Sequence, residues 1–559
     1  MHIKLVAING RFTHSSLALF HVRNELESHC PELSNEILQL TVRDPYYEVL
    51  ARLSRNTPDA IFFSASVWNS DKVEELIVDL NALLPSCLLV VGGPQAEVVG
   101  HNVGKNACTV VRGAVEAVEK NFYSDLQAKS LHPHYGRSFF HVKNVRFVSP
   151  YREEDFETHL KNRNIYYESS RGCPFSCTYC LSSAENGIVH KDPVQVQREL
   201  DQIMAHDTRV LRFVDRTFND LPGRALALWK LVLEYESDTL FHFEIAPDRI
   251  SEEMFAFLAT VPPGRFQFEI GIQSTHEPTL AAIKRRIDPD VARVTLSRLA
   301  SLNNIHLHAD LILGLPHETE ASYLKSFADV FAMGPHYIQM GLLKLLPDTA
   351  ISRDAAEYEY RFCSRPPYSV LANKWLDAES LQKLYWFSEC VEKFYNNRYF
   401  PSLWDYLRRH KEDISSVFTI LLALAHEHRL FQLAATQELL CSLLMKALSN
   451  REDASVIREL FVYDWLSCGH RNLPSCLEVD GESGRELKDR LYRDLAMDIP
   501  GLYSKTERNR FFKQTVFYQF SAECLVELGF ATGEPSCIAF LRQRDKSLMR
   551  LQKVALLPL

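Results

Sequence analysis

The stretch SSRGCPFSCTYC, residues 169–180, places three cysteines close together in the chain. Cys177 follows Cys173 by four positions, and Cys180 follows Cys177 by three. The run at 165–172 directly before them has the composition of a β-strand. We therefore expect the three thiols to lie on a loop that begins where this strand ends.

Three thiols on one loop point to a particular kind of iron site. Three thiolates can bind three irons of a four-iron cluster, which leaves the fourth iron without a protein ligand. Clusters held by four cysteines usually transfer electrons, whereas an open iron can bind the amino and carboxylate groups of a methionine. An electron passed to the adjacent sulfonium then breaks a carbon–sulfur bond. The pattern favours a 4Fe-4S cluster that cleaves S-adenosylmethionine (SAM), with Cys173, Cys177 and Cys180 as its ligands.

Two simpler interpretations of these cysteines are less suitable. A single cysteine is usually a small buried hydrophobic residue, but that does not account for three at this spacing. A zinc site normally adds a second Cys or His pair at ligand spacing, and His190, the nearest histidine, has no such partner. The other ten of the 13 cysteines are scattered, as expected for buried thiols in a reducing cytoplasm.

Length and composition indicate a soluble protein of several domains. A chain of 559 residues is too long for one ordinary core, and 46% hydrophobic with 24% charged residues is typical of globular proteins. No apolar stretch is long enough for a bilayer span, and the first residues lack the features of a signal peptide. A net charge of −9 gives no clear nucleic-acid footprint. We expect a cytoplasmic protein without membrane insertion.

Hydrophobic periodicity divides the chain into four regions. Residues 1–135 alternate strand-like runs (3–8, 60–66, 88–94) with helical stretches (17–26, 73–84), which predicts a Rossmann-like, doubly wound parallel sheet. Residues 136–164 have no clear period and predict a linker. Residues 165–365 return to α/β alternation, and residues 366–559 are expected to be mostly helical, with long segments at 378–396, 415–448 and 507–528.

The third region has the pattern of a barrel. Six strand-like runs lie at 165–172, 210–217, 241–248, 266–273, 306–315 and 337–346, with helical runs between them. This predicts a partial (β/α)6 barrel of the TIM type. Polar residues fall at the strand ends, where barrel enzymes place reactive groups. They are Glu244, Asp248, Glu269, Gln273, Asp310 and, with an orientation left open, Lys344.

CxxxCxxC after the first barrel strand resembles the radical SAM superfamily over 165–365. The resemblance implies that Tyr179, just before the third cysteine, lies near the adenine of SAM. The segment FVDRTFN at 213–219 replaces the glycine pair that usually meets the methionyl group, so the candidates there are Asp215, Arg216 and Asn219. GIQS at 271–274 and LILGLPHET at 311–319 resemble the fourth and fifth strands of the family. They support Glu269, Gln273 and Gly314, with Glu244, as further cofactor-binding residues.

The first region resembles the cobalamin-binding domain that precedes the barrel in one branch of this superfamily. Glycine-rich turns let a backbone approach a flat ligand closely. The Asp-x-His-x-x-Gly loop of mutase-type domains is absent, which favours the branch without a histidine below the cobalt. At 112–115, Arg and Gly match the relatives and Ala and Val depart from them. The implied corrin contacts are Asn9, His14, Ser64, Ser66, Trp68, Gly92, Gly93 and Pro94.

The last region resembles the helical tail of an uncharacterised cobalamin-dependent subgroup. Its aromatic and basic residues either cap the barrel or, as amphipathic packing favours, belong to a helical core. These residues are Trp375, Trp386, Tyr399, Trp404 and Arg408.

These resemblances imply an enzyme that uses a 4Fe-4S cluster, SAM and cobalamin. The expected reaction is methylation of an unactivated carbon: a 5′-deoxyadenosyl radical removes hydrogen, and cobalamin delivers a methyl group that a second SAM replaces. Radical cyclisation or rearrangement is the alternative within the class, and a non-catalytic iron–sulfur sensor or scaffold is the alternative outside it. An electron donor such as flavodoxin or ferredoxin is expected, and the substrate is unknown.

Overall fold

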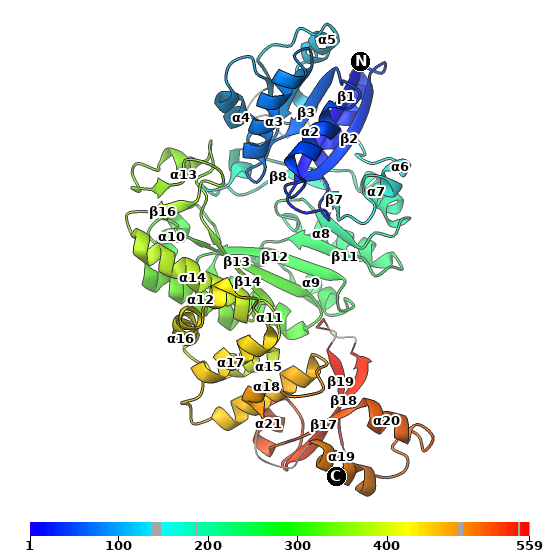
Figure 1. The fold of residues 1–559 in the computed structure, drawn as a ribbon, viewed down its shortest axis with the longest axis vertical. Helices are drawn as coiled ribbons and strands as arrows, with labels where there is room; N and C mark the ends of the chain where they lie inside the picture. The colour runs from blue at the N-terminus through cyan, green and yellow to red at the C-terminus, as the bar shows by residue number, and fades with distance from the viewer. Residues whose placement is uncertain (137–146, 185–186, 479–483, 546–547, 550, 558–559) are drawn as a thin grey trace.

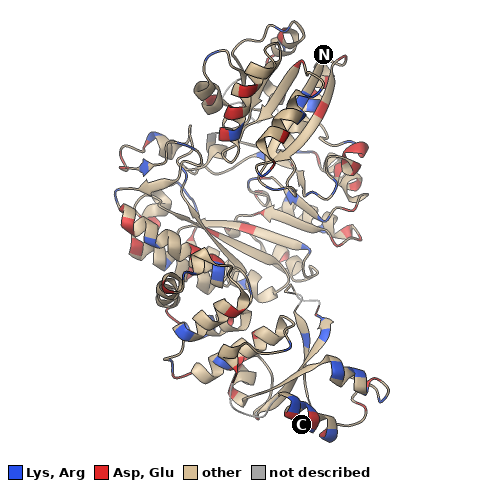
Figure 2. Cartoon of the chain, viewed as in Figure 1, with Lys and Arg blue, Asp and Glu red and all other residues tan. Residues whose placement is uncertain are grey.

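The computed structural model describes residues 1–136, 147–184, 187–478, 484–545, 548–549 and 551–557. Two parallel sheets, a helical region and a small antiparallel sheet follow one another along the long axis of the molecule (Figure 1). Charged residues of both signs are spread over all of these parts (Figure 2). Within the described residues, no helix combines the length and the apolar character needed to cross a bilayer.

The first sheet is parallel and has the order β2-β1-β3-β4-β5-β6. Its strands are β1 (His2–Asn9), β2 (Ser34–Thr41), β3 (Ala60–Ser64), β4 (Leu88–Gly92), β5 (Thr109–Arg112) and β6 (His134–Gly136). The doubly wound fold predicted from the sequence is confirmed, and the structure adds the edge strand β2. The chain order reverses between β1 and β3, and ligands of such sheets bind at this switch point, beyond the carboxyl ends of the strands.

Helices cover both faces of this sheet because its strands are apolar on both sides. Helices α2 (Tyr46–Ser54), α3 (Ser70–Leu83) and α4 (Ala96–Val103) pack on one face and form a closed core with Val6 and Ile8 of β1. Helices α1 (Leu17–His29) and α5 (Asn121–Gln127) lie on the other face, against Leu5 and Ala7. That second core continues without a break into the barrel, so the two α/β regions share packing.

The second sheet is a parallel half-barrel with the order β14-β13-β12-β11-β10-β7. Its strands are β7 (Ile165–Tyr167), β10 (Val210–Phe213), β11 (Leu240–Glu244), β12 (Phe266–Gln273), β13 (His306–Leu313) and β14 (Tyr337–Leu342). Its main helices are α7 (Pro193–Met204), α8 (Pro222–Glu234), α9 (Glu252–Leu258), α10 (Glu277–Ala282), α11 (Pro289–Leu302) and α12 (Glu320–Met333). Each of the six predicted strand regions contains a barrel strand, and the partial barrel is confirmed.

An alternation in β12 separates the outside of the barrel from its inside. Phe266, Phe268, Ile270 and Ile272 are buried against the helices, and the residues between them are less buried and mostly polar. Trp229 of α8 stacks on Phe268 with ring centroids 5.3 Å apart. The aromatic core thus turns the polar half of each strand toward the lumen.

The last region is helical first and a small α/β unit afterwards. Its helices are α14 (Ala378–Phe394), α15 (Pro401–Arg409), α16 (Ile414–Glu427), α17 (Gln437–Ala447), α18 (Ala454–Ser467), α19 (Gly484–Asp494), α20 (Arg508–Gln514) and α21 (Ala522–Glu527). The single segment predicted at 415–448 is two helices, because Arg429 adopts a left-handed backbone conformation and Thr436 caps the next helix through the Leu439 amide.

The helix predicted at 507–528 is wrong over its middle. Residues Val516–Phe520 form β17, which pairs antiparallel with β18 (Ser536–Arg544), and β18 pairs in turn with β19 (Gln552–Leu556). An aromatic run such as VFYQF suits a strand equally well, and pairing with a distant segment decided the outcome. The large aromatic residues expected in a helical core are partly there: Trp404 is 2% exposed, whereas Trp386 is 36% exposed.

The Gly92–Gly93 turn after β4 has a reason of its own in the fold. Gly93 has φ +100°, and a Cβ there would lie 2.5 Å from the backbone oxygen of Ala65. Gly10, at the equivalent turn after β1, has open space at its Cβ position. The left-handed backbone alone costs a residue with a Cβ about 1–2 kcal/mol.

We therefore expect Gly93→Ala to lower the melting temperature of the cofactor-free protein, and Gly10→Ala to change it little. Differential scanning fluorimetry of the two variants, purified without cobalamin, measures this. Equal melting temperatures would contradict the packing argument and leave ligand approach as the reason for the glycine.

Candidate functional site

The chain leaves the barrel sheet just before the first cysteine. The predicted strand 165–172 is divided: β7 ends at Tyr167, and β8 (Ser170–Gly172) pairs antiparallel with β9 (Ile188–His190). The buried carboxylate of Asp215 causes the break. It accepts hydrogen bonds from the Ser169 amide (2.9 Å) and from the hydroxyls of Ser169 and Ser170 (2.6 Å each). The cysteine loop therefore starts from a fixed point over the barrel.

The loop between the cysteines is attached on two sides. The Thr178 amide donates to the carbonyl of Ile283, and the Thr178 carbonyl accepts from the Ile351 amide, each at 3.0 Å. The Phe175 ring has the guanidinium of Arg249 5.1 Å from its centroid and that of Arg285 at 5.3 Å. Protein contacts alone thus hold the loop in place.

All three predicted cluster ligands line one cavity. Arg285 donates toward the Cys177 sulfur at 3.9 Å, and the Cys173 sulfur lies 3.7 Å from the Thr217 hydroxyl. Burial, with the neighbouring thiols, raises the pKa of Cys173. Within the described part of the chain, no three His, Cys, Asp or Glu side chains are close enough to hold a single metal ion. A cubane cluster takes its three thiolates on three different irons, so three cysteines spread over one cavity wall fit such a cluster without having to meet at a single ion.

Lumen-facing residues of β11, β12 and β13 complete the cavity; Glu244 and Gln273 end their strands, whereas Glu269 and Asp310, predicted at strand ends, lie within theirs. Glu244 of β11 is in register with Glu269 of β12, and Gly271 is in register with Asp310 of β13. A bulge between Gly271 and Gln273 gives Gln273 a left-handed backbone. The predicted residues on the cavity wall are Cys173, Cys177, Tyr179, Cys180, Arg216, Glu244, Glu269, Gln273 and Asp310.

The carboxyl groups on this wall differ in their ionisation. Burial raises the pKa of Glu244 to about 7, with Arg216 opposing and Glu269 adding to the shift. Burial also raises the pKa of Asp310 well above its usual range. The hydrogen bond from His242 (2.9 Å) outweighs burial and lowers the pKa of Glu269. The wall therefore offers protonated and ionised carboxyl groups side by side, as donors and acceptors for a polar ligand.

Three predicted cofactor contacts lie off the cavity wall. Asp215 is fully buried under the cysteine loop, as described above. The Asn219 side chain donates to the Ala246 carbonyl and accepts from its amide, each at 2.8 Å, and so joins two strand ends. The carbonyl of Gly314 accepts from the Tyr360 hydroxyl at 2.9 Å. The structure gives these residues supporting contacts, and their proposed contact with SAM stays a prediction.

Arg285 is the main wall residue that the sequence did not indicate. It follows α10, twelve residues beyond the end of β12, and only the fold returns it to the cysteine loop. It also donates to the Gly271 carbonyl at the bulge. Phe175 and Thr217 also line the cavity, and the sequence did not indicate them either.

The predicted cobalamin contacts lie at the carboxyl ends of β1, β3 and β4. Asn69 closes the loop after β3 by accepting from the Ser66 amide (2.7 Å) and donating to the Ser64 carbonyl (3.0 Å). Trp68 in this loop is 60% exposed, and its indole donates to the Ile8 carbonyl at 3.2 Å. Gly92, Gly93 and Pro94 form the neighbouring turn. An exposed aromatic ring beside a close-approach turn suits a flat ligand.

Asn9 and His14 have partners within the protein. The Asn9 side chain donates to Gln39 at 3.1 Å, and the His14 ring lies 3.2 Å from the Tyr166 hydroxyl of the barrel. Burial lowers the pKa of His14. The histidine thus touches the first barrel strand, at the junction of the two sheets.

Hydrogen bonds connect the loops at the carboxyl edge of the first sheet to the segments that flank the barrel. The Asn164 amide donates to the Thr13 carbonyl at 2.7 Å, before β7 begins. On the opposite side, the Tyr368 hydroxyl donates to Gln95 at 2.8 Å. The loops after β1 and β4 are therefore anchored by residues that directly precede and directly follow the barrel in the chain, on either side of the switch point.

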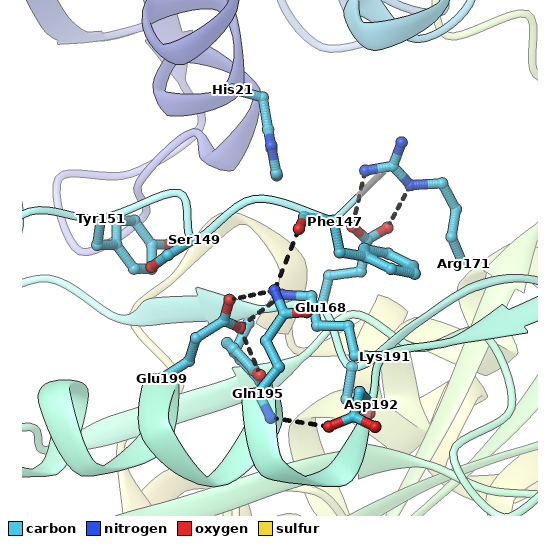
Figure 3. Close-up of polar contacts among 12 residues, drawn as sticks. His21, Phe147, Ser149, Tyr151, Glu168, Arg171, Lys191, Asp192, Gln195 and Glu199 are labelled. Atoms are coloured by element: carbon cyan, nitrogen blue, oxygen red, sulfur yellow. Dashed lines mark hydrogen bonds and ion pairs between the residues drawn. The ribbon is translucent and has the colours of Figure 1, made fainter. Parts of the chain in front are cut away.

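A largely buried ionic network joins the first region to the base of the cysteine loop, and Figure 3 shows its Arg171–Glu168 pair with His21 of α1 nearby. Arg171 makes two 2.7 Å bonds to Glu168 and a 3.0 Å bond to Glu116, which lies 3.5 Å from His21 of α1. Burial disfavours the charge on Glu116, but Arg171 and His21 outweigh it and lower its pKa. Arg171 stands two residues before Cys173, so docking of the first region and placement of the loop share one contact.

Comparison with known proteins identifies the central region. Residues 167–330 match the sequence profile described as the radical SAM superfamily, and residues 356–538 match a family described as a protein of unknown function (DUF4080). The chain therefore carries a radical SAM domain, the type of domain that implies a 4Fe-4S cluster and SAM. The segment after it, residues 356–538, belongs to the match with the family of unknown function.

Among curated relatives, 2-(S-pantetheinyl)-carbapenam-3-carboxylate methyltransferase of Streptantibioticus cattleyicolor is 25% identical over 53% of this chain and 48% of its own length. The cobalamin-dependent radical SAM methyltransferase TokK of Streptomyces tokunonensis is 27% identical over 33% of this chain and 28% of its own. The chain thus spans half or less of the length of these relatives.

Solved structures show the same overall fold. The cobalamin-dependent SAM radical enzyme OxsB, with aqua-cobalamin bound, superposes with a TM-score of 0.59 at 13% identity, over 88% of this chain and 84% of its own. The radical SAM methyltransferase TsrM of Kitasatospora setae, with cobalamin and a 4Fe-4S cluster, gives 0.51 at 15% identity, over 64% and 74%. The arrangement of an α/β domain before a radical SAM half-barrel is therefore shared with cobalamin-dependent enzymes of this superfamily.

Arg285 is expected to support the cluster without binding it. Arg285→Met should reduce iron retention by the reconstituted protein about ten- to hundredfold, the usual effect of losing a group that contacts a metal ligand. Arg286→Met, whose parent side chain is exposed, is the matched control. Iron assays after dilution measure the effect, and equal retention by both variants would contradict it.

The raised pKa of Glu244 predicts a pH-dependent stability. Between pH 4.5 and about 7 the native carboxyl keeps a proton that the unfolded chain has lost, so stability falls as pH rises through this window. Glu244→Gln removes this dependence. The melting temperature of the variant minus that of the wild type should therefore increase over the window and level off above it. A difference that is constant with pH would contradict the assignment.

Proposed function

We propose that this chain is a cobalamin-dependent radical SAM methyltransferase acting on an unactivated carbon of a substrate still to be found. The observation that carries the proposal is the position of Cys173, Cys177 and Cys180 on the wall of one cavity, which polar lumen-facing residues of the half-barrel strands complete. The radical SAM match over 167–330 includes these cysteines. The methyltransferase names of the relatives add support for the reaction.

Cobalamin is proposed from the first region. Its switch point faces the barrel, with the exposed Trp68 and the Gly92–Gly93 turn at the edge. OxsB and TsrM, which share the fold, have cobalamin in their structures. When bound, the cluster and SAM supply a 5′-deoxyadenosyl radical that removes a hydrogen atom, and cobalamin supplies the methyl group.

The protein residues hold and orient these groups. We assign SAM contacts to Tyr179, Arg216, Glu244, Glu269 and Gln273, because all of them line the cysteine cavity. Protonated Glu244 can donate to a ligand oxygen, and ionised Glu269 can accept from a hydroxyl or ammonium group. Arg285 holds the cysteine loop through Phe175 and Cys177.

The reaction also needs a reductant, for which we propose a flavodoxin or ferredoxin in the cytoplasm. A reducing compartment agrees with the 13 free thiols of the chain. We propose that loops and the 356–538 region select the substrate; the family that matches this region has no described function.

The test is anaerobic turnover of protein reconstituted with iron, sulfide and cobalamin. SAM and a reductant are added, and 5′-deoxyadenosine and S-adenosylhomocysteine are quantified. Cys177→Ala is the inactive control, and Cys390→Ala, a buried cysteine of α14 outside the cavity, is the matched control that should stay active.

Both products, lost only in Cys177→Ala, are the expected result. Deoxyadenosine alone would favour the alternative within the class, a cobalamin-dependent radical cyclase or rearrangement enzyme. Neither product from cluster-loaded protein, with candidate substrates present, would contradict an enzyme and favour an iron–sulfur sensor or binding scaffold.

A further inference from the structure

A second cavity of ≈ 380 Å³ lies in the C-terminal region, away from the cysteine loop. It opens between the segment after α14, the start of α17, the end of α18 and the chain beyond β18. Ligand pockets for small molecules begin at about 300 Å³, so this space admits a small organic ligand. Its wall combines cationic, amide and apolar side chains, among them Arg398, Gln437, His470, Arg544, Leu548 and Met549.

Arg398 places a cation in this cavity without an acidic partner. Its Nη2 is buried and has no hydrogen-bond partner, and no carboxylate pairs with the guanidinium within the described residues. Burial lowers its pKa to about 10, so it is still charged at neutral pH. A buried cation is normally paired, because removal from water is costly when no counter-charge compensates.

The backbone around Arg398 is held firmly in this position. Asn396 accepts from the Ile338 amide and donates to its carbonyl, each at 2.9 Å, which fastens the segment to β14. Arg398 itself has φ 60°, a left-handed conformation that is unusual for this residue type. The fold therefore presents the guanidinium to the cavity at some cost to the local backbone.

Gln437 adds a second donor that lacks a strong acceptor. The His470 ring nitrogen lies 2.8 Å from Gln437 Oε1, and stacking on Trp465 at 4.1 Å holds the ring. With its oxygen engaged by His470, Gln437 has a buried amide nitrogen whose one neighbouring acceptor is the Cys468 thiol, a weak acceptor. Two buried donors on one wall call for a ligand that accepts from both.

We propose that this cavity binds the anionic head, a carboxylate or a phosphate, of a small molecule with an apolar body. Arg398 and Gln437 donate to the anionic oxygens, and the exposed Arg544 adds positive charge at the rim. Leu548, Met549 and Leu551 cover the apolar part. The site is separate from the cysteine cavity, so it stands whether or not the chain is a methyltransferase.

The test is isothermal titration calorimetry on the full-length protein with sodium octanoate and with inorganic phosphate at constant ionic strength. We expect saturable binding of at least one probe. Arg398→Gln should weaken it about tenfold or more, as expected for loss of a charged hydrogen bond. Arg471→Gln, whose parent side chain is exposed and off the cavity wall, is the matched control and should leave binding unchanged.

Octanoate binding alone would identify a carboxylate with an apolar tail, and phosphate binding alone a phosphate head group. If Arg398→Gln lowers the melting temperature without a probe present, Arg544→Gln at the exposed rim provides the same comparison. Failure of both probes to bind, or undiminished binding by both cavity variants, would overturn the proposal.

Discussion

The buried carboxylate of Asp215 decides where the chain leaves the barrel sheet. It sits just beyond β10 and accepts three hydrogen bonds from Ser169 and Ser170, so β7 cannot continue along its neighbour. Arg224 adds bonds of 2.9 and 3.0 Å to the carbonyl and hydroxyl of Ser169. An unpaired buried carboxyl group is costly, so the three hydrogen bonds to Asp215 favour the turn that moves the chain into β8 and on to the cysteines. The position of the cluster loop depends on this turn.

The same turn connects the loop to the first sheet. Arg171, one residue beyond the two serines, bonds Glu168 and Glu116 in a largely buried interface, and a hydrophobic core runs from the face of α1 and α5 into the barrel. Buried charge pairs add little net stability but are very sensitive to geometry, so they specify how two bodies dock. In this chain they set the switch point of one sheet against the open side of the other.

Much of the site could be predicted from residues that are close in sequence. The three cysteines and the turn at Gly92 and Gly93 each follow a recognisable strand, and Glu244 and Glu269 lie on adjacent parallel strands that face the lumen. Which residues of the segment after β10 line the cavity could not be predicted this way. Asp215, Arg216 and Asn219 are neighbours, yet only Arg216 lines the cavity, because strand exit and packing turn the other two inward.

The sequence by itself determined the cluster motif, the two parallel α/β regions and most of their strands, because periodicity and ligand spacing are local properties. Only the tertiary structure decided which side chains meet across long separations. Arg285 contacts Cys177 although the two residues are 108 positions apart. β17 pairs with β18 where the sequence suited a helix equally well. Arg398 and Gln437 line one cavity, and no sequence motif indicates it. Such contacts depend on how whole elements pack. Hydrophobic patterning shows which face of an element is buried, but it does not show which other element that face packs against.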